Sequence, residues 1–133
     1  MPISNTAKGR MGELIAATAI EQYGWSTIIT PMNHIDILAM KDGVFIRVQV
    51  KASTYKLEKS TPTYRFMTST SSQQYLDTMN IDILAAVALD SRRVIFYNID
   101  DLTKTLRIHP DKFNIVDIER SSWETAVNKV LGL

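Results

Sequence analysis

The sequence predicts a single α/β domain over residues 1–133, with a mixed central β-sheet flanked by helices. Apolar stretches of strand length are separated by turn-forming residues, and in several of them apolar and polar positions alternate. The segments before and after these strands carry the signals of helix ends. With 45% hydrophobic residues, a chain of this length can form one core.

A first helix is predicted to begin with Asn5 or Thr6 as its cap and to end at about residue 23, because Gly24 follows. Gly9 and Gly12 lie in its first turns, where each costs up to about 1 kcal/mol relative to alanine in a helix interior. Two explanations stay open for these glycines: close packing of the helix on the sheet, and close approach of a phosphate backbone.

The remaining elements are strands and short helices. Strands are predicted at residues 26–30, 35–41, 44–51, 63–67, 82–89 and 92–99. Helices are predicted at residues 68–79 and at residues 121–131, the second one capped by Ser121 or Ser122. A single helical turn is predicted within residues 100–106.

The composition restricts the kinds of site and location. The chain has no cysteine, so disulfides and thiolate metal sites are excluded. A reducing compartment fits this composition, and a cytoplasmic location, inside the cell together with DNA, is expected. The first residues lack the apolar core of a signal peptide. No stretch of apolar residues approaches the length of a membrane span, which is about 18 residues. The net charge is +1, but the first half of the chain is the more basic one, which is compatible with a polyanionic partner.

The segment at residues 44–51, VFIRVQVK, has an apolar face and a polar face. Every second residue from Val44 to Val50 is apolar and belongs to the core face, because side chains alternate along a strand. The other face ends in Gln49 and Lys51, where further apolar residues would be expected in a fully buried strand. These two polar residues are therefore candidates for a functional site.

A hairpin turn before this strand brings a carboxylate to the same place. Asp42-Gly43 is typical of a two-residue turn in which both residues have positive φ. This turn places Asp36 opposite Gln49, with Cβ atoms about 5 Å apart. A three-residue turn would instead move Asp36 to the other face. With the two-residue turn, Asp36, Gln49 and Lys51 converge.

The first helix contributes a second carboxylate. Glu13 shares a stripe of the predicted helix with Ala16, Ala17 and Ile20, and such a stripe is expected to lie on the sheet. A carboxylate in that position needs a partner, which a metal ion, Lys51 or a water molecule would provide. A simple ion pair with a neighbouring basic residue is the alternative explanation.

These residues occur in an order that resembles the PD-(D/E)XK nuclease superfamily, over roughly residues 5–100. The order is Gly12-Glu13, then His34-Ile35-Asp36, then Gln49-Val50-Lys51 after the hairpin. The variant VQVKAS is most similar to the branch of intron-encoded homing endonucleases with a Q-V-K motif. Archaeal Holliday-junction resolvases have the same order but usually carry Glu at the position of Gln49. Here Ile35 also stands where the superfamily often has a proline.

The resemblance implies a restriction-endonuclease-like core and a Mg²⁺-dependent DNA endonuclease, in which Mn²⁺ substitutes for Mg²⁺. Asp36, the Gln49 amide and the Val50 carbonyl are then the metal ligands, because Mg²⁺ prefers oxygen donors. Lys51 orients the attacking water or neutralises developing charge, and Glu13 holds an outer-shell water or a second ion. Two alternatives stay open: a junction resolvase, and a catalytically inactive DNA-binding protein, which the neutral Gln49 favours.

Further residues are assigned to DNA, to structure or to assembly. The candidate DNA contacts are Lys8, Arg10, Ser53, Lys56 and Arg65, with Thr54, Tyr55 and Lys59 as additional candidates, and a solvated surface is the simpler explanation for each. Asp82 repeats the local sequence of Asp36, IDIL, but is expected to be structural. A homodimer or a dimer of dimers is expected, because one site cuts one strand. Trp123, Val127 and residues 130–131 are predicted to form either its interface or part of the core.

Overall fold

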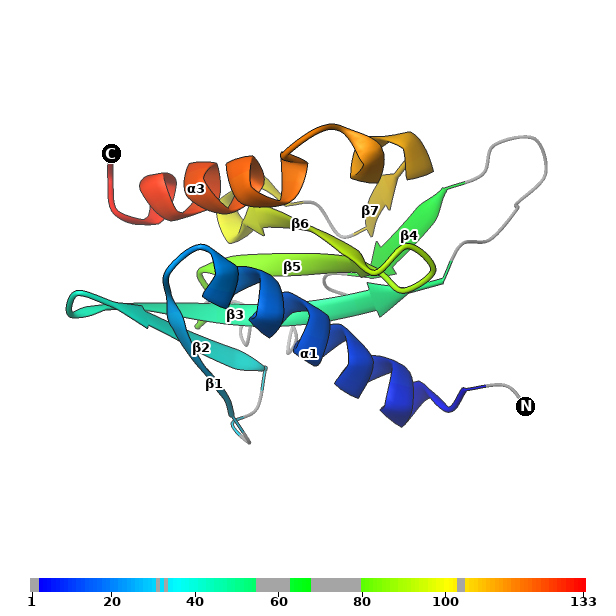
Figure 1. The fold of residues 1–133 in the computed structure, drawn as a ribbon, viewed down its shortest axis with the longest axis horizontal. Coiled ribbons are helices and arrows are strands. Elements are labelled where there is room, and N and C mark those ends of the chain that lie inside the picture. Colours follow the sequence, from blue (N-terminus) through cyan, green and yellow to red (C-terminus); the bar gives the residue numbers. More distant parts are fainter. Residues whose placement is uncertain (1–2, 31, 33, 55–62, 68–79, 103–104) are drawn as a thin grey trace.

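The computed structural model describes residues 3–30, 32, 34–54, 63–67, 80–102 and 105–133, which form a layered α/β fold (Figure 1). Two helices cover one face of a five-stranded sheet, and a separate two-stranded ribbon packs on the other face. The elements are α1 (Asn5–Gln22), β1 (Ser26–Ile29), β2 (Ile37–Lys41), β3 (Val44–Ser53), β4 (Tyr64–Met67), β5 (Ile83–Ala88), β6 (Arg93–Asn98), η1 (Ile99–Asp101), β7 (Thr105–Ile108), η2 (Pro110–Asn114) and α3 (Ile118–Val130).

The central sheet has the strand order β1-β2-β3-β5-β6. Its strands pair antiparallel except for β3 and β5, which are parallel, so the predicted mixed sheet is confirmed. The β2–β3 hairpin turns at Asp42 and Gly43, whose φ angles of 50° and 79° are both positive, as the two-residue turn requires. Strands β4 and β7, far apart in the sequence, pair to form the second sheet, called here the β4–β7 ribbon.

Two hydrophobic cores lie on opposite faces of the central sheet. The strand β5 contributes alternately to both, and all six of its residues are buried. Ile83, Ala85 and Val87 face α1 and α3. Leu84, Ala86 and Ala88 face the β4–β7 ribbon. The continuous apolar run at residues 83–88 is explained by this burial on both faces.

Helix α1 begins at Asn5, one or two residues earlier than predicted, because its cap is Ser4 and not Asn5 or Thr6. The Ser4 side chain accepts a hydrogen bond from the Ala7 N–H at 3.1 Å. At Gly12 an added Cβ would lie 2.9 Å from the Cβ of Ala52, so this glycine permits close packing on β3. At Gly9 nothing lies within 4 Å, and packing gives no reason for a glycine there.

Helix α3 closes the β6 edge of the central sheet with its side chains. The N–H of Val94 donates to Glu119 Oε2 at 3.1 Å, and the N–H of Phe96 donates to Ser122 Oγ at 3.0 Å. These amides would otherwise be unpaired at a sheet edge. The expectation that Ser121 or Ser122 caps the helix is therefore wrong, because α3 begins earlier, at Ile118.

Two further expectations are tested by the structure. Trp123 and Val127 are buried in the first core, where Trp123 packs against Trp25 and Phe96, so they do not form an exposed interface. The helical turn predicted within residues 100–106 is present in part as the 3-10 helix η1, which begins at Ile99, but β7 begins already at Thr105. The predicted helix at residues 68–79 lies outside the described residues. Among the described residues, no helix combines the length and apolar character of a membrane span.

Candidate active site

Part of the predicted site lies along a stretch of β3 that β2 does not reach. Strand β2 pairs with β3 only up to Val48, whereas β5 pairs with β3 as far as Ser53 (Figure 1). Beyond Val48, the side of β3 that faces away from β5 therefore has no partner strand among the described residues. We call this stretch, residues 49–53 on the side away from β5, the open edge of β3.

Asp36 lies at the open edge, directly before β2 begins. Its Oδ2 accepts a hydrogen bond from the Val50 N–H at 2.7 Å, in the place where a partner strand would offer a backbone carbonyl. Its other oxygen, Oδ1, accepts no hydrogen bond from the described residues. The register predicted from the hairpin is confirmed from Lys41, which pairs with Val44, to Ile37, which pairs with Val48. The N–H of Asp36 donates to the Val48 carbonyl at 2.9 Å, so the regular pairing ends there.

The Asp36 carboxyl group has a raised pKa. Burial is the largest effect and raises the pKa above the ordinary value for aspartate. The Val50 N–H and the charges of Lys51 and His34 act in the opposite direction. The site thus holds a half-buried carboxyl group close to a lysine, as the sequence predicts. His34, two residues before Asp36, has a left-handed backbone conformation with a φ of 67°.

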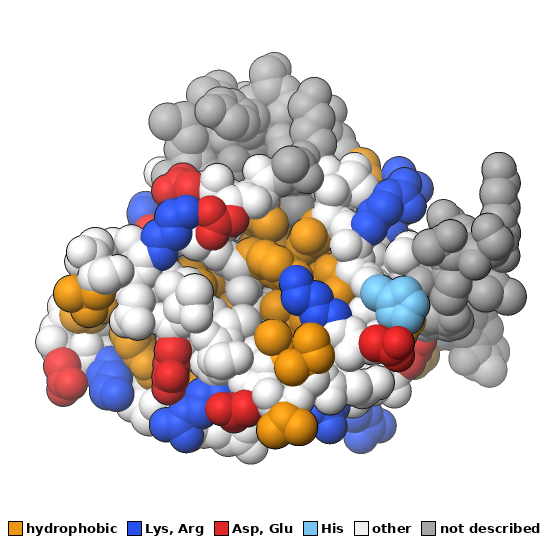
Figure 2. Space-filling view, turned by 90° about the horizontal axis from the view of Figure 1, so that it is seen from above, with side chains coloured by type: hydrophobic (Ala, Val, Ile, Leu, Met, Phe, Trp, Pro, Cys, Tyr) orange, Lys and Arg blue, Asp and Glu red, His pale blue; other side chains and the backbone are white. Residues whose placement is uncertain are grey.

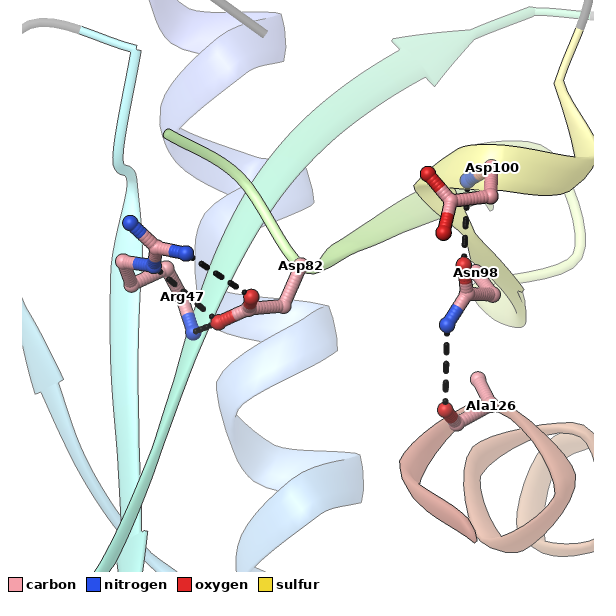
Figure 3. A network of polar contacts seen from close by, with 5 residues as sticks. All are labelled: Arg47, Asp82, Asn98, Asp100 and Ala126. Carbon is pink, nitrogen blue, oxygen red and sulfur yellow. Dashed lines mark hydrogen bonds and ion pairs between the residues drawn. The ribbon is translucent and has the colours of Figure 1, made fainter. Parts of the chain in front are cut away.

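Asp82 provides a direct comparison with Asp36, because each follows an isoleucine before a strand that pairs with β3. Asp82 Oδ2 accepts the N–H of Arg47 at 2.9 Å, but both of its oxygens also bind the Arg47 guanidinium (Figure 3). The Asp82 carboxylate is therefore fully engaged and ties β5 to β3, which agrees with the structural role expected for it. No pattern in the sequence pointed to Arg47, although it shares the strand face of Gln49.

Gln49 is the most deeply buried of the predicted site residues, with 5% of its surface exposed. Its Oε1 is buried and has no hydrogen-bond partner among the residues that the structure describes. A buried acceptor without a partner costs about 1–3 kcal/mol, so this oxygen needs a group that it can bind. Gln49 neighbours Leu84 of β5 in the parallel register, on the sheet face that also carries Lys51.

The Val50 carbonyl is directed toward the open edge. Alternate residues of a strand point their backbone groups to opposite sides, and the carbonyls of Arg47 and Ser53 accept N–H groups from Asp82 and Leu89 on the β5 side. Residue 50 has the opposite parity, and its N–H already meets Asp36 at the open edge. The carbonyl oxygen of the same residue leaves the strand on that side.

Glu13 reaches the open edge from the helix side of the sheet. The preceding residue, Gly12, packs on Val50 and Ala52, which places the first half of α1 over this part of β3. Burial raises the pKa of Glu13, and the Asp36 charge raises it further, so the two carboxyl groups interact. Glu13 also lies 3.7 Å from Arg10, so the simple ion pair considered from the sequence is present as well.

Comparison with known proteins gives a structural match. No protein-family model matches the chain, and no curated protein matches it. The solved structure of a bacterial homing endonuclease, I-Ssp6803I, matches 92% of this chain and 98% of its own length, with a TM-score of 0.64 and 18% sequence identity. The chain has the fold of a bacterial homing endonuclease. At this level of identity the likeness establishes the fold, and the chemistry has to be judged from the residues.

The candidate donors are of a kind that suits a hard cation. Within the described part of the chain, no three His, Cys, Asp or Glu side chains form a cluster that could hold a metal ion. The available donors are instead the carboxylates of Asp36 and Glu13, the unpartnered Gln49 Oε1 and the Val50 carbonyl. All are oxygen atoms, the donor type that Mg²⁺ prefers. The residues therefore fit the ion expected from the sequence.

The residues predicted to contact DNA lie on separate elements, as far as the structure describes them. Lys8 and Arg10 lie on α1, beside Glu13, and Ser53 ends β3, where its Oγ donates to the Thr54 carbonyl at 3.2 Å. Arg65 is exposed on β4, in the second sheet. Lys56, Tyr55 and Lys59 lie outside the described residues.

Proposed function

We propose that this protein is a divalent-metal-dependent DNA endonuclease of the homing-endonuclease type, which hydrolyses phosphodiester bonds. The position of Asp36 carries this proposal: the Val50 N–H fixes one carboxylate oxygen, and the other remains at the open edge, near the charges of Lys51 and Glu13. The fold shared with a bacterial homing endonuclease supports DNA as the substrate.

Asp36, the Gln49 amide oxygen and the Val50 carbonyl would hold Mg²⁺, and Mn²⁺ would substitute for it. A bound ion of this kind polarises the scissile phosphate and lowers the pKa of a water molecule. The hydrogen bond from Val50 keeps the Asp36 carboxylate in one orientation, so little side-chain reorganisation is needed when the site is used. The neutral Gln49 reduces the negative charge that faces the DNA phosphate.

Lys51 and Glu13 complete the site from opposite faces of the sheet. Lys51 carries positive charge beside Asp36, where it attracts the scissile phosphate and stabilises the charge that develops on it during hydrolysis. Glu13, whose pKa is raised by burial and by Asp36, is suited to orient a water molecule or to accept its proton.

A two-fold homodimer, or a dimer of dimers, is the proposed working unit on DNA. The chain has a single candidate site, and cleavage of both strands at related positions calls for two sites related by symmetry.

The proposal is tested by incubating the purified protein with plasmid DNA and with a synthetic four-way junction, each with Mg²⁺ and with EDTA. Wild-type protein is expected to cleave only with Mg²⁺, and Asp36→Asn is expected to remove cleavage. Asp82→Asn is the matched control: it is expected to cleave at temperatures where it is folded, although it weakens the clamp to Arg47. Full cleavage by Asp36→Asn would show that the site is wrongly assigned.

One observation favours the alternative of a DNA-binding protein that does not cleave DNA: the neutral residue Gln49 occupies the most deeply buried position of the site. Binding of DNA with no cleavage in Mg²⁺ or Mn²⁺ would establish it. Preferential cleavage of the four-way junction over plasmid would instead identify a junction resolvase.

A further inference from the structure

Helix α1 carries a glycine at a position where packing does not require one. With about 100° of rotation per residue, Gly9 lies between Gly12 and Glu13 on the helix surface, about 40° from Glu13. At Gly12 this side of the helix packs on β3, where an added Cβ would lie 2.9 Å from Ala52. At Gly9, three residues earlier, nothing among the described residues lies within 4 Å of such an atom. The side of α1 that the sheet covers at Gly12 is therefore open at Gly9.

The helix itself does not need this glycine either. The φ angle of Gly9 is not positive, so its backbone conformation suits any residue. The N–H of Lys8 already donates to the Ser4 carbonyl at 3.0 Å, and the helix continues to Gln22, so Gly9 lies inside regular helix. Glycine is a poorer helix former than alanine, because its backbone loses more freedom when the helix forms. What glycine offers in return is a bare backbone that another molecule can approach closely.

The side chains around Gly9 are small, polar or basic. The first two turns of α1 have the sequence NTAKGR, in which Lys8 and Arg10 flank Gly9 and no acidic residue occurs. Thr6 is exposed, and 60% of the Arg10 side chain is exposed although it lies 3.7 Å from Glu13. Basic, hydroxyl and amide side chains are the groups that contact the phosphates and sugars of DNA. The open side of α1 is thus complementary in charge to a polyanion.

The basic residues on the face that carries α3 are arranged differently. Figure 2 shows the molecule from above, where acidic and basic side chains are interspersed around an apolar centre. On this face Arg120 is paired with Glu124 at 3.0 Å, and Lys129 is paired with Asp101. Carboxylates beside the basic groups would repel a nucleic acid. The start of α1 therefore fits DNA better than the α3 face does.

Gly9 also lies next to the candidate active site. Glu13 follows it by about one turn, or about 6 Å along the helix axis. The charge of Asp36 raises the pKa of Glu13, so this part of α1 is close to the open edge. In Figure 1, the first turns of α1 extend away from the sheet on the side where β3 ends. A DNA strand whose scissile phosphate meets Asp36 and Glu13 can continue past Gly9.

We propose that the sugar–phosphate backbone of the DNA substrate contacts α1 at Gly9, with Lys8 and Arg10 on phosphates next to the scissile one. This inference rests on the proposed function, since it names a surface that holds the same DNA. The missing side chain lets the DNA strand come within van der Waals distance of the helix, and the flanking basic groups bind phosphate oxygens. The contact positions the strand without reading its sequence.

The test measures affinity for a fluorescein-labelled duplex of mixed sequence by fluorescence anisotropy in EDTA, together with melting temperature. Gly9→Ala is expected to melt at the same or a higher temperature, because alanine favours the helix, and still to bind the duplex more weakly. Gly9→Leu is expected to bind about tenfold more weakly or worse, because its side chain fills the space that the DNA strand needs. Thr18→Ala, at an exposed position on the opposite side of α1, also favours the helix and is the matched control with wild-type affinity.

A salt titration tests the basic residue beside the glycine. Arg10→Gln is expected to lower the slope of log affinity against log salt by about 0.9, the effect of one lost phosphate contact. Arg120→Gln, which removes a charge on α3, is expected to keep the wild-type slope. An unchanged slope in Arg10→Gln would refute the phosphate contact of this side chain.

The outcomes separate this inference from the proposed function. Wild-type affinity in Gly9→Leu, with cleavage intact, would overturn the contact at Gly9 and leave the endonuclease standing. Weaker binding by Gly9→Leu in a protein that never cleaves would support the contact and refute the endonuclease. If Gly9→Leu dissociates a dimer in sedimentation but binds DNA like wild type, the surface joins two copies of the chain and the inference is wrong. Should Gly9→Leu melt at a lower temperature, Gly9→Ala decides the contact by itself.

Discussion

Asp36 and Asp82 both accept a backbone N–H of β3 with one carboxylate oxygen, and they differ in what the second oxygen meets. In Asp82 it is bound by the Arg47 guanidinium, and in Asp36 it makes no hydrogen bond to the described residues. Burial without a full set of partners raises the pKa of Asp36. The same residue type thus contributes stability in one place and costs stability in the other.

The cost at Asp36 predicts how stability depends on pH. Because the folded-state pKa is raised above the ordinary value of 3.8, the folded protein holds the proton more tightly than the unfolded chain. The stability from the protonated group is fully present below the unfolded pKa and is lost as pH rises through the folded pKa. Without divalent cations, Asp36→Asn is therefore expected to melt at a higher temperature than wild type at pH 7, and the difference should shrink toward pH 3.8.

If Asp36 binds Mg²⁺, adding Mg²⁺ is expected to reverse this order, so that wild type melts at a higher temperature than Asp36→Asn. At Mg²⁺ concentrations about 100-fold above the dissociation constant, wild type should gain about 2.7 kcal/mol, and Asp36→Asn should gain nothing. Thermal denaturation with and without Mg²⁺ measures both effects without any cleavage assay. An equal gain in the two proteins would place the ion elsewhere.

Gln49 is expected to combine a stability cost with a catalytic role. Gln49→Leu removes the buried Oε1, which has no hydrogen-bond partner among the described residues, and should raise the free energy of unfolding by up to about 1–3 kcal/mol. Gln49→Ala should lower the cleavage rate at least about tenfold, or roughly 1.4 kcal/mol of barrier. Gln49→Glu should keep activity with a lower Mg²⁺ optimum. Wild-type rates in Gln49→Ala across a Mg²⁺ titration would exclude a ligand role.

At the scale of elements, the contact of α1 with β3 positions Glu13 over the open edge. Gly12→Ala would bring a Cβ to 2.9 Å from Ala52, and relief of that clash moves the helix. We expect a loss of about 1–3 kcal/mol in stability and a weaker effect of Asp36 on the Glu13 pKa. Gly9→Ala, with open space around it, is the control and should be neutral or stabilise by up to about 1 kcal/mol. Chemical denaturation of the two variants measures the difference; equal stabilities would contradict the packing role.

Some elements could be predicted from their own residues, and others could not. The β2–β3 hairpin and its register could be predicted because Asp42 and Gly43 determine the turn by their own conformational preferences. Strand β7 could not, because its four residues acquire strand structure by pairing with β4, far away in the sequence. The site residues were predictable from their order, but the open edge was not, since it depends on where β2 begins relative to the end of β3. The pattern at residues 35–40 placed Asp36 within a strand, and it lies just before one.

At the scale of the whole molecule, one chain offers one candidate site, and burial of Trp123 and Val127 removes the central residues of the predicted interface. Of that prediction, Leu131 remains exposed, at 43%. The proposed dimer or dimer of dimers predicts a mass near two or four times 15.0 kDa in sedimentation at micromolar concentration, with or without DNA. Leu131→Ser is expected to shift the equilibrium toward monomer if the end of α3 forms the contact. A monomer under all conditions would contradict paired sites within one assembly.

The turn at Asp42 and Gly43 restricts how related chains can differ in length. Adding one residue there would reverse the alternation along β2, withdraw Asp36 from Gln49 and remove the carboxylate that holds the Val50 N–H. Adding two residues would lengthen the hairpin by one pair and leave that alternation unchanged. Insertions and deletions in this hairpin are therefore expected to occur in even numbers among functional relatives, although its tip lies far from the chemistry.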